Sequence, residues 1–125
     1  MVLAIVFAAS LTALTAEDVQ SASNKLRANG TLVTSELQHA APLFACVRTE
    51  LKVSPPSKSA DAQQQYQEYM QQMSASAERC GAAKELAFWT ASLKAAYPDW
   101  GDQLAQAVAA ESLGFFIFDS AMSGP

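Results

Sequence analysis

Two side chains in the sequence have the types and the spacing of a metal or acid–base site. Glu36 and His39 stand three residues apart, so a helix places both on one face. A di-iron site of the ferritin-like kind needs two such Glu-x-x-His pairs and two further glutamates. His39 is the only histidine of the chain, and it lies off the apolar stripe that contains Leu37 and Phe44. We therefore predict a solvent-facing histidine, with no catalytic residue, no metal site and no cofactor.

Cys46 and Cys80 are the other reactive pair. In an exported protein an even number of cysteines favours a disulfide, whereas in a reducing cytosol both would stay as small apolar residues. If the helices that carry them formed a simple antiparallel hairpin, the two cysteines would lie roughly 20 Å apart along the axis. A Cys46–Cys80 disulfide therefore requires that the connecting segment run back along the bundle, or that one of the helices be broken.

Other motifs of catalysis or nucleotide binding are missing from the sequence. It has no Gly-x-Ser-x-Gly, no P-loop, no Gly-x-Gly-x-x-Gly and no Cys-x-x-Cys. The formal net charge of −4 argues against nucleic acid as a partner, because binding phosphates needs an excess of Lys and Arg. All charged residues after Lys94 are acidic, which is typical of a solvated helix face rather than of an acidic docking surface. We predict that the protein is not an enzyme and does not bind nucleic acid.

The helices that would position these residues follow an uncharged apolar stretch, residues 1–16. Its length fits the apolar core of a secretory signal peptide, although no Lys or Arg precedes it and cleavage after Thr15 or Ala16 meets the small-x-small rule poorly. The alternatives are an uncleaved, buried helix and a membrane anchor, for which the run is shorter than the usual length of about 20 residues. We expect a signal peptide or an apolar N-terminal helix, with any membrane contact confined to residues 1–16.

Two helices are predicted in the first half of the remaining chain. Thr15 and Asp18 are typical of a helix start, because the threonine can cap the first turn and the acid lies at the positive end of the helix dipole. Asn29-Gly30 predicts the end of that helix in a left-handed cap. A second helix is expected from residues 31–34 onward, with a kink or a break at Pro42.

The second half of the chain contains three more helical patterns. A Pro- and Ser-rich linker covers residues 53–59, and helices are predicted over 60–79, 82–96 and 102–121. The alternation that marks a β-strand never persists. Residues 17–125 are therefore expected to form an all-α fold, a single-domain bundle of four to five amphipathic helices.

Asn29-Gly30-Thr31 is also an N-glycosylation sequon at an expected surface turn. Asn29 is therefore a candidate glycosylation site, which matters only on a eukaryotic secretory route.

Most of the large aromatic residues lie late in the chain, where they form either a core seam or a contact surface. The last helix is apolar on more than one face, so Phe116 and Ile117 would be exposed if Phe115 and Phe118 face inward. The residues that we expect to contact a ligand or partner are Trp89, Trp100, Phe116 and Ile117.

These observations predict an exported protein, secreted or periplasmic, that acts by binding. Its expected partner is an apolar small molecule or another protein. The alternative is a structural subunit of a larger assembly that retains the apolar N-terminal helix.

Overall fold

A computed structural model describes residues 14–53 and 62–123 of the chain, and these residues form five α-helices. They are α2 (Ala16–Arg27), α3 (Gly30–Val53), α4 (Ala62–Arg79), α5 (Ala82–Ala96) and α6 (Asp102–Ser123). The described part contains no β-strand, and the predicted all-α bundle is confirmed. None of its helices has the length and apolar character needed to cross a membrane.

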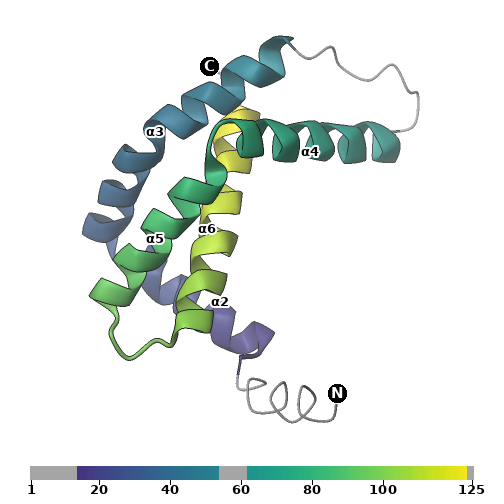
Figure 1. The fold of residues 1–125 in the computed structure, drawn as a ribbon. Coiled ribbons are helices and arrows are strands. Elements are labelled where there is room, and N and C mark those ends of the chain that lie inside the picture. Colours follow the sequence, from purple (N-terminus) through teal and green to yellow (C-terminus); the bar gives the residue numbers. More distant parts are fainter. Residues whose placement is uncertain (1–13, 54–61, 124–125) are drawn as a thin grey trace, which may run out of the picture.

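The helix α6 is the centre of the bundle, and it packs against α5, α2 and α3 (Figure 1). Small side chains make this close approach possible, because Ala105, Val108, Ala109 and Ser112 are all fully buried. Trp89 and Leu93 of α5, Leu26 of α2 and Val47 of α3 complete the core around them. The predicted apolar character of α6 on more than one face therefore reflects a helix with neighbours on several sides.

The start of α2 agrees with the sequence pattern. Thr15 Oγ1 accepts a hydrogen bond from Asp18 N, and Asp18 Oδ2 accepts one from Thr15 N, both at 3.1 Å. This reciprocal capping box satisfies two backbone donors that the helix itself cannot pair. Residues 1–13 lie outside the described residues, and with them most of the predicted signal peptide or N-terminal helix.

The end of α2 differs from the expectation. The prediction of a left-handed cap at Asn29-Gly30 is wrong. The residue that caps the end of α2 is Ala28, in a right-handed conformation, and Gly30 is already the first residue of α3. Asn29 instead caps α3, since its Oδ1 accepts a hydrogen bond from Leu32 N at 3.2 Å.

Of the kink or break predicted at Pro42, the structure has no break, because α3 is one continuous helix from Gly30 to Val53. Figure 1 shows α3 bending along its length, as expected of a helix that contains an internal proline. Pro42 is exposed, while the next residues, Leu43 and Phe44, are buried in the core. Packing of these apolar neighbours holds the helix together despite the lost backbone hydrogen bond.

The first six residues of α4 do not pack against the bundle. Residues 62–67 are all exposed, and the buried positions are Met73, Ser76 and Ala77. Figure 1 shows α4 lying across one end of the bundle and projecting to one side. The predicted linker over residues 53–59 falls mostly outside the described residues.

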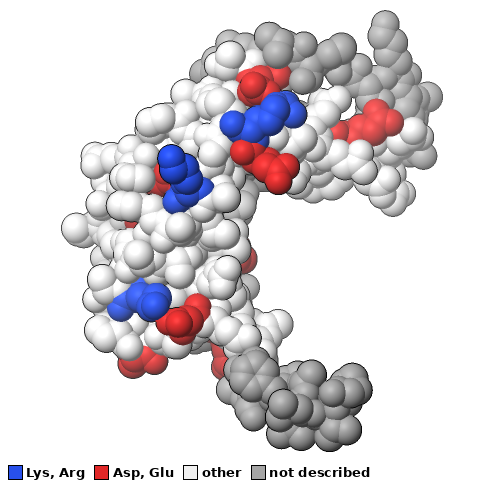
Figure 2. All heavy atoms as spheres, in the orientation of Figure 1, with Lys and Arg blue, Asp and Glu red and all other residues white. Residues whose placement is uncertain are grey.

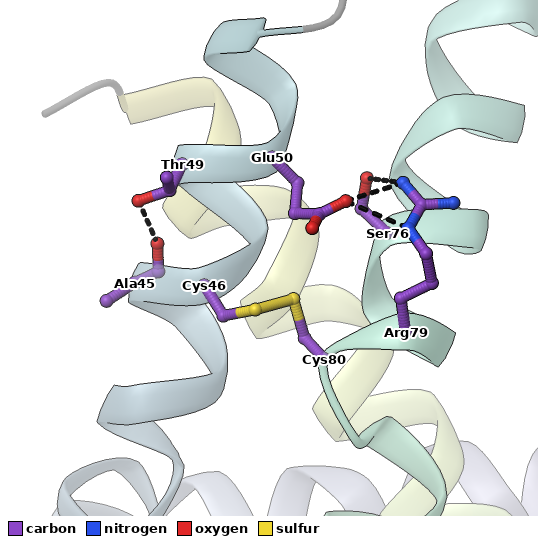
Figure 3. The surroundings of a disulfide bond; sticks show 7 residues. All are labelled: Ala45, Cys46, Thr49, Glu50, Ser76, Arg79 and Cys80. Atoms are coloured by element: carbon purple, nitrogen blue, oxygen red, sulfur yellow. Dashed lines mark hydrogen bonds and ion pairs between the residues drawn. A yellow bond between two sulfur atoms is a disulfide. The ribbon is translucent and has the colours of Figure 1, made fainter.

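Cys46 and Cys80 form a disulfide whose Cα atoms are 5.9 Å apart (Figure 3). Neither α3 nor α4 is broken to allow it. The two helices are not a simple antiparallel hairpin, since α4 crosses the direction of α3 and brings its last residues to the middle of that helix (Figure 1). Beside the disulfide, Arg79 Nη2 pairs with Glu50 Oε1 at 2.6 Å.

Gly81 makes the corner between α4 and α5. Its φ of 98° lies in the left-handed region, which a residue with a Cβ enters only at a cost, and the backbone N–H groups of Lys84 and Glu85 donate to its carbonyl. Gly114, in contrast, is an exposed residue inside α6, and an added Cβ there would meet no atom within 4 Å.

Substitution of these two glycines by alanine is expected to change the free energy of unfolding in opposite directions. Gly81→Ala is expected to lower the free energy of unfolding by about 1 kcal/mol because of backbone strain, and Gly114→Ala to raise it by about 0.5 to 1 kcal/mol because alanine favours the helix. Urea unfolding followed by far-UV circular dichroism measures both. An equal effect of the two substitutions would contradict the corner geometry.

The disulfide predicts a second stability difference. It closes a loop with a sequence separation of 34 residues, for which loss of unfolded-chain entropy gives about 3 to 4 kcal/mol. Reduction, or the double substitution Cys46→Ala and Cys80→Ala, is expected to lower the unfolding free energy by this amount. The double variant is its own control, because reductant should leave its stability unchanged. An unfolding curve of the parent protein that is unaffected by reductant would contradict the bond.

Candidate functional site

A polar cluster joins α3 to α5 inside the bundle. Glu85 Oε2 lies 2.7 Å from His39 Nδ1, and it accepts a hydrogen bond from Trp89 Nε1 at 2.9 Å. The ring of His39 stacks on that of Phe88 with centroids 3.5 Å apart. The prediction that His39 simply faces solvent is therefore incomplete: its side chain is 46% exposed, but one nitrogen and one ring face are engaged by α5.

Glu36, one turn earlier on α3, belongs to the same interior. The residue is only 2% exposed, and its Oε2 has no hydrogen-bond partner. Burial raises the pKa of Glu36 from an ordinary 4.5 to about 7; a hydrogen bond with Ser92 lowers it, and the charge of Glu85 raises it further. The cluster thus contains a carboxyl group that is poorly solvated in its charged form.

The cluster does not have the geometry of a metal or nucleophilic site. Within the described ranges, no three His, Cys, Asp or Glu side chains converge as metal ligands. Glu36 and His39 are each engaged from α5, through Ser92 and Glu85, rather than turned toward a shared ligand. Cys46 is bonded to Cys80 in a disulfide, so it has no free thiol to act as a nucleophile. What this arrangement can do is fix Trp89 in the core and bind protons.

A pocket of about 510 Å³ opens between α2 and the turn that joins α5 to α6; we call it the Trp100 pocket. Its apolar wall contains Leu14, Ala22, Trp100 and Leu104. Its polar and charged lining comprises Asp18, Ser21, Lys25, Asp99 and Gln103, and Gly101 completes the wall. The lining is therefore mixed, with one apolar wall beside a polar and charged one, and the volume falls in the range of small-molecule sites.

Contacts outside the pocket fix the position of the Trp100 side chain. Trp100 is 9% exposed and stacks on Tyr97, with ring centroids 4.3 Å apart. The Tyr97 hydroxyl accepts a hydrogen bond from Asn29 Nδ2, and Lys25 Nζ lies 5.5 Å from the Tyr97 ring centroid. Contacts from α2, from the α2–α3 junction and from the end of α5 therefore fix the indole against which a ligand would pack.

The structure separates the four predicted contact residues. Only Trp100 lines the Trp100 pocket. Trp89 is fully buried, and Ile117 is buried as well, so the expected exposure of Ile117 is wrong. Phe116 is half-buried, and its ring lies at 61° to that of Trp89 with centroids 6.2 Å apart. The exposed aromatic residue of α6 is Phe115, whose ring centroid lies 4.8 Å from the Arg27 guanidinium of α2.

A second open hollow, also of about 510 Å³, lies between the projecting half of α4 and the end of α6; we call it the α4–α6 notch. Tyr66 and Met122 are more than half exposed there, beside Tyr69 and Gln65. Its lining residues carry no charge. Over the face shown in Figure 2, basic and acidic side chains are mixed rather than gathered into one patch of a single sign.

Sequence reasoning missed most of the pocket lining. Asp18 and Lys25 come from α2, whereas Asp99 and Leu104 follow α5, so nothing in their linear spacing connects them. The one available signal was the Pro98–Gly101 turn, which places Trp100 at a bundle end. Asn29 is half-buried, and its side-chain nitrogen donates to Tyr97; its glycosylation stays a prediction.

Comparisons with family models, with curated protein sequences and with solved structures find no match to this chain.

The polar cluster predicts which of its members the fold needs. Glu85→Ala leaves the Trp89 N–H buried without an acceptor, so we expect a loss of about 2 to 3 kcal/mol of unfolding free energy. His39→Ala should cost less, because its ring is half exposed, and the adjacent exposed Lys84→Ala should change little. Urea unfolding of the three variants measures the order. A Glu85 variant as stable as the Lys84 variant would contradict the assigned hydrogen bond.

Proposed function

We propose that this protein is an exported, non-enzymatic binding domain that takes an apolar small molecule in the Trp100 pocket. The observation that carries the proposal is the wall made by Trp100, Leu104 and Ala22 around a volume of about 510 Å³. Rigid support of the indole by Tyr97 favours binding, since little side-chain freedom remains to be lost.

Two features support export. The first is the Cys46–Cys80 disulfide, because disulfides persist in oxidising compartments and are rare in the cytosol. The apolar stretch over residues 1–16 has the length of a signal-peptide core. Cleavage after Ala16 would remove Leu14 from the pocket wall and Thr15 from the start of α2, so the position of the cut also affects the proposed site.

The pocket lining favours binding over catalysis. It contains two carboxylates and an ammonium group but no histidine or cysteine. A ligand there would be held by contact with the apolar wall and oriented by the polar rim.

The second candidate function, a structural subunit of a larger assembly, is favoured by a different feature. In the α4–α6 notch, Tyr66 and Met122 are 55% and 58% exposed, and α4 projects from the bundle. Contact with another subunit would bury these side chains. Sedimentation analysis separates the two functions, because the assembly subunit must associate and the small-molecule binder need not.

The two tryptophans provide the test of the proposed pocket. Titration with 1-octanol is expected to change the emission of the parent protein in a saturable way, and Trp100→Phe should abolish the change because Trp89 is fully buried. Leu104→Ala should weaken binding about fivefold through lost apolar contact. Leu86→Ala, which also truncates a half-buried leucine but outside this pocket, is the matched control.

Saturable binding that Leu104→Ala weakens and Leu86→Ala leaves unchanged would support the pocket. An octanol-dependent change that persists in Trp100→Phe, or no change in the parent protein, would overturn it.

A further inference from the structure

The seam between α3 and α5 contains a carboxyl group with no stable charged partner. Glu36 is 2% exposed, and one of its oxygens has no hydrogen-bond partner. The charged group that acts on it is another carboxylate, Glu85 of α5, whose negative charge raises the pKa of Glu36 further. Burying a carboxylate in such a place costs far more free energy than burying the protonated carboxyl group.

We propose that Glu36 is a proton-binding site that makes the α3–α5 seam a pH-sensitive latch, closed in mildly acidic solution and weakened in alkaline solution. The inference is independent of the Trp100 pocket, because no residue of the cluster lines that pocket.

The groups that face Glu36 define the direction of the effect. From α5, Glu85 adds negative charge and the Ser92 hydroxyl provides a hydrogen bond. From α3 itself, His39 is directed at Glu85 rather than at Glu36. On the other helices packed against α3, Arg27 of α2 pairs with Glu111 of α6, and Arg79 of α4 pairs with Glu50. Both arginines are thus paired with other carboxylates, so a proton is what neutralises Glu36.

The sign of the pH dependence follows from the two states of the chain. The pKa of Glu36 is about 7 in the fold against an ordinary 4.5, so the folded protein holds the proton more tightly. Stability from this group is complete below pH 4.5, declines as the pH rises, and is lost above about pH 7. The latch therefore weakens over the pH interval that separates an acidic compartment from a neutral one.

The test compares Glu36→Gln with the parent protein and with Glu78→Gln, which neutralises an exposed glutamate of α4. Urea unfolding at pH 5 and pH 8.5 gives the equilibrium constant of each. Between these values the unfolding constant of the parent should rise about 100-fold relative to that of Glu36→Gln. Glu78→Gln should follow the parent at both pH values.

A second variant separates Glu36 from the neighbouring imidazole. His39→Gln should keep the parent's Glu36-dependent rise, since the histidine is paired with Glu85. Titration of the Glu36 carboxyl carbon by NMR should give a midpoint near 7 in the folded protein. A midpoint near 4.5, or an equal pH response in the parent and in Glu36→Gln, would overturn the proposal.

Discussion

The close approach of three helices to α6 is the constraint on which this fold depends. Ala105, Val108 and Ala109 bring the backbones together, and Trp89 of α5 fills the space between them. A large side chain so deep in a helical core needs an acceptor for its one polar atom, and Glu85 provides it. The charge of the same carboxylate also raises the pKa of Glu36. Glu85 therefore both satisfies the buried indole and disfavours the ionised form of Glu36.

The disulfide stabilises a part of the bundle that has little core of its own. Residues 62–67 of α4 are exposed, and its buried positions, Met73, Ser76 and Ala77, lie in its second half. The bond between Cys46 and Cys80, with the Arg79–Glu50 ion pair beside it, fixes the C-terminal end of α4 to the second half of α3 (Figure 3). The Gly81 corner then directs α5 along α6, which places Trp100 at the opposite end of the bundle from the projecting part of α4.

Local signals in the sequence predicted much of the fold. The capping pair Thr15 and Asp18, and the bounds of the helix over 82–96, agree with the structure, because caps and glycine corners depend on nearby residues. Asn29 was misinterpreted because two abutting helices let one asparagine begin the second instead of ending the first. The inward face of α6 and the partner of His39 could not be read from periodicity, since both are set by helices distant in sequence. The Trp100 pocket could not be predicted for the same reason. Trp100 itself was a predicted contact residue, but the walls of the pocket come from two helices that are distant in sequence.

Binding of an apolar small molecule in the Trp100 pocket can be tested residue by residue. The measurement is a two-dimensional amide NMR spectrum of the oxidised, uniformly ¹⁵N-labelled protein with and without saturating 1-octanol. Binding in the Trp100 pocket should shift the amide signals of Ala22, Gly101 and Leu104 and the Trp100 indole signal, and should leave the Trp89 indole signal unchanged. Shifts gathered instead at Tyr66, Tyr69 and Met122 in the α4–α6 notch, or no shifts at all, would contradict it.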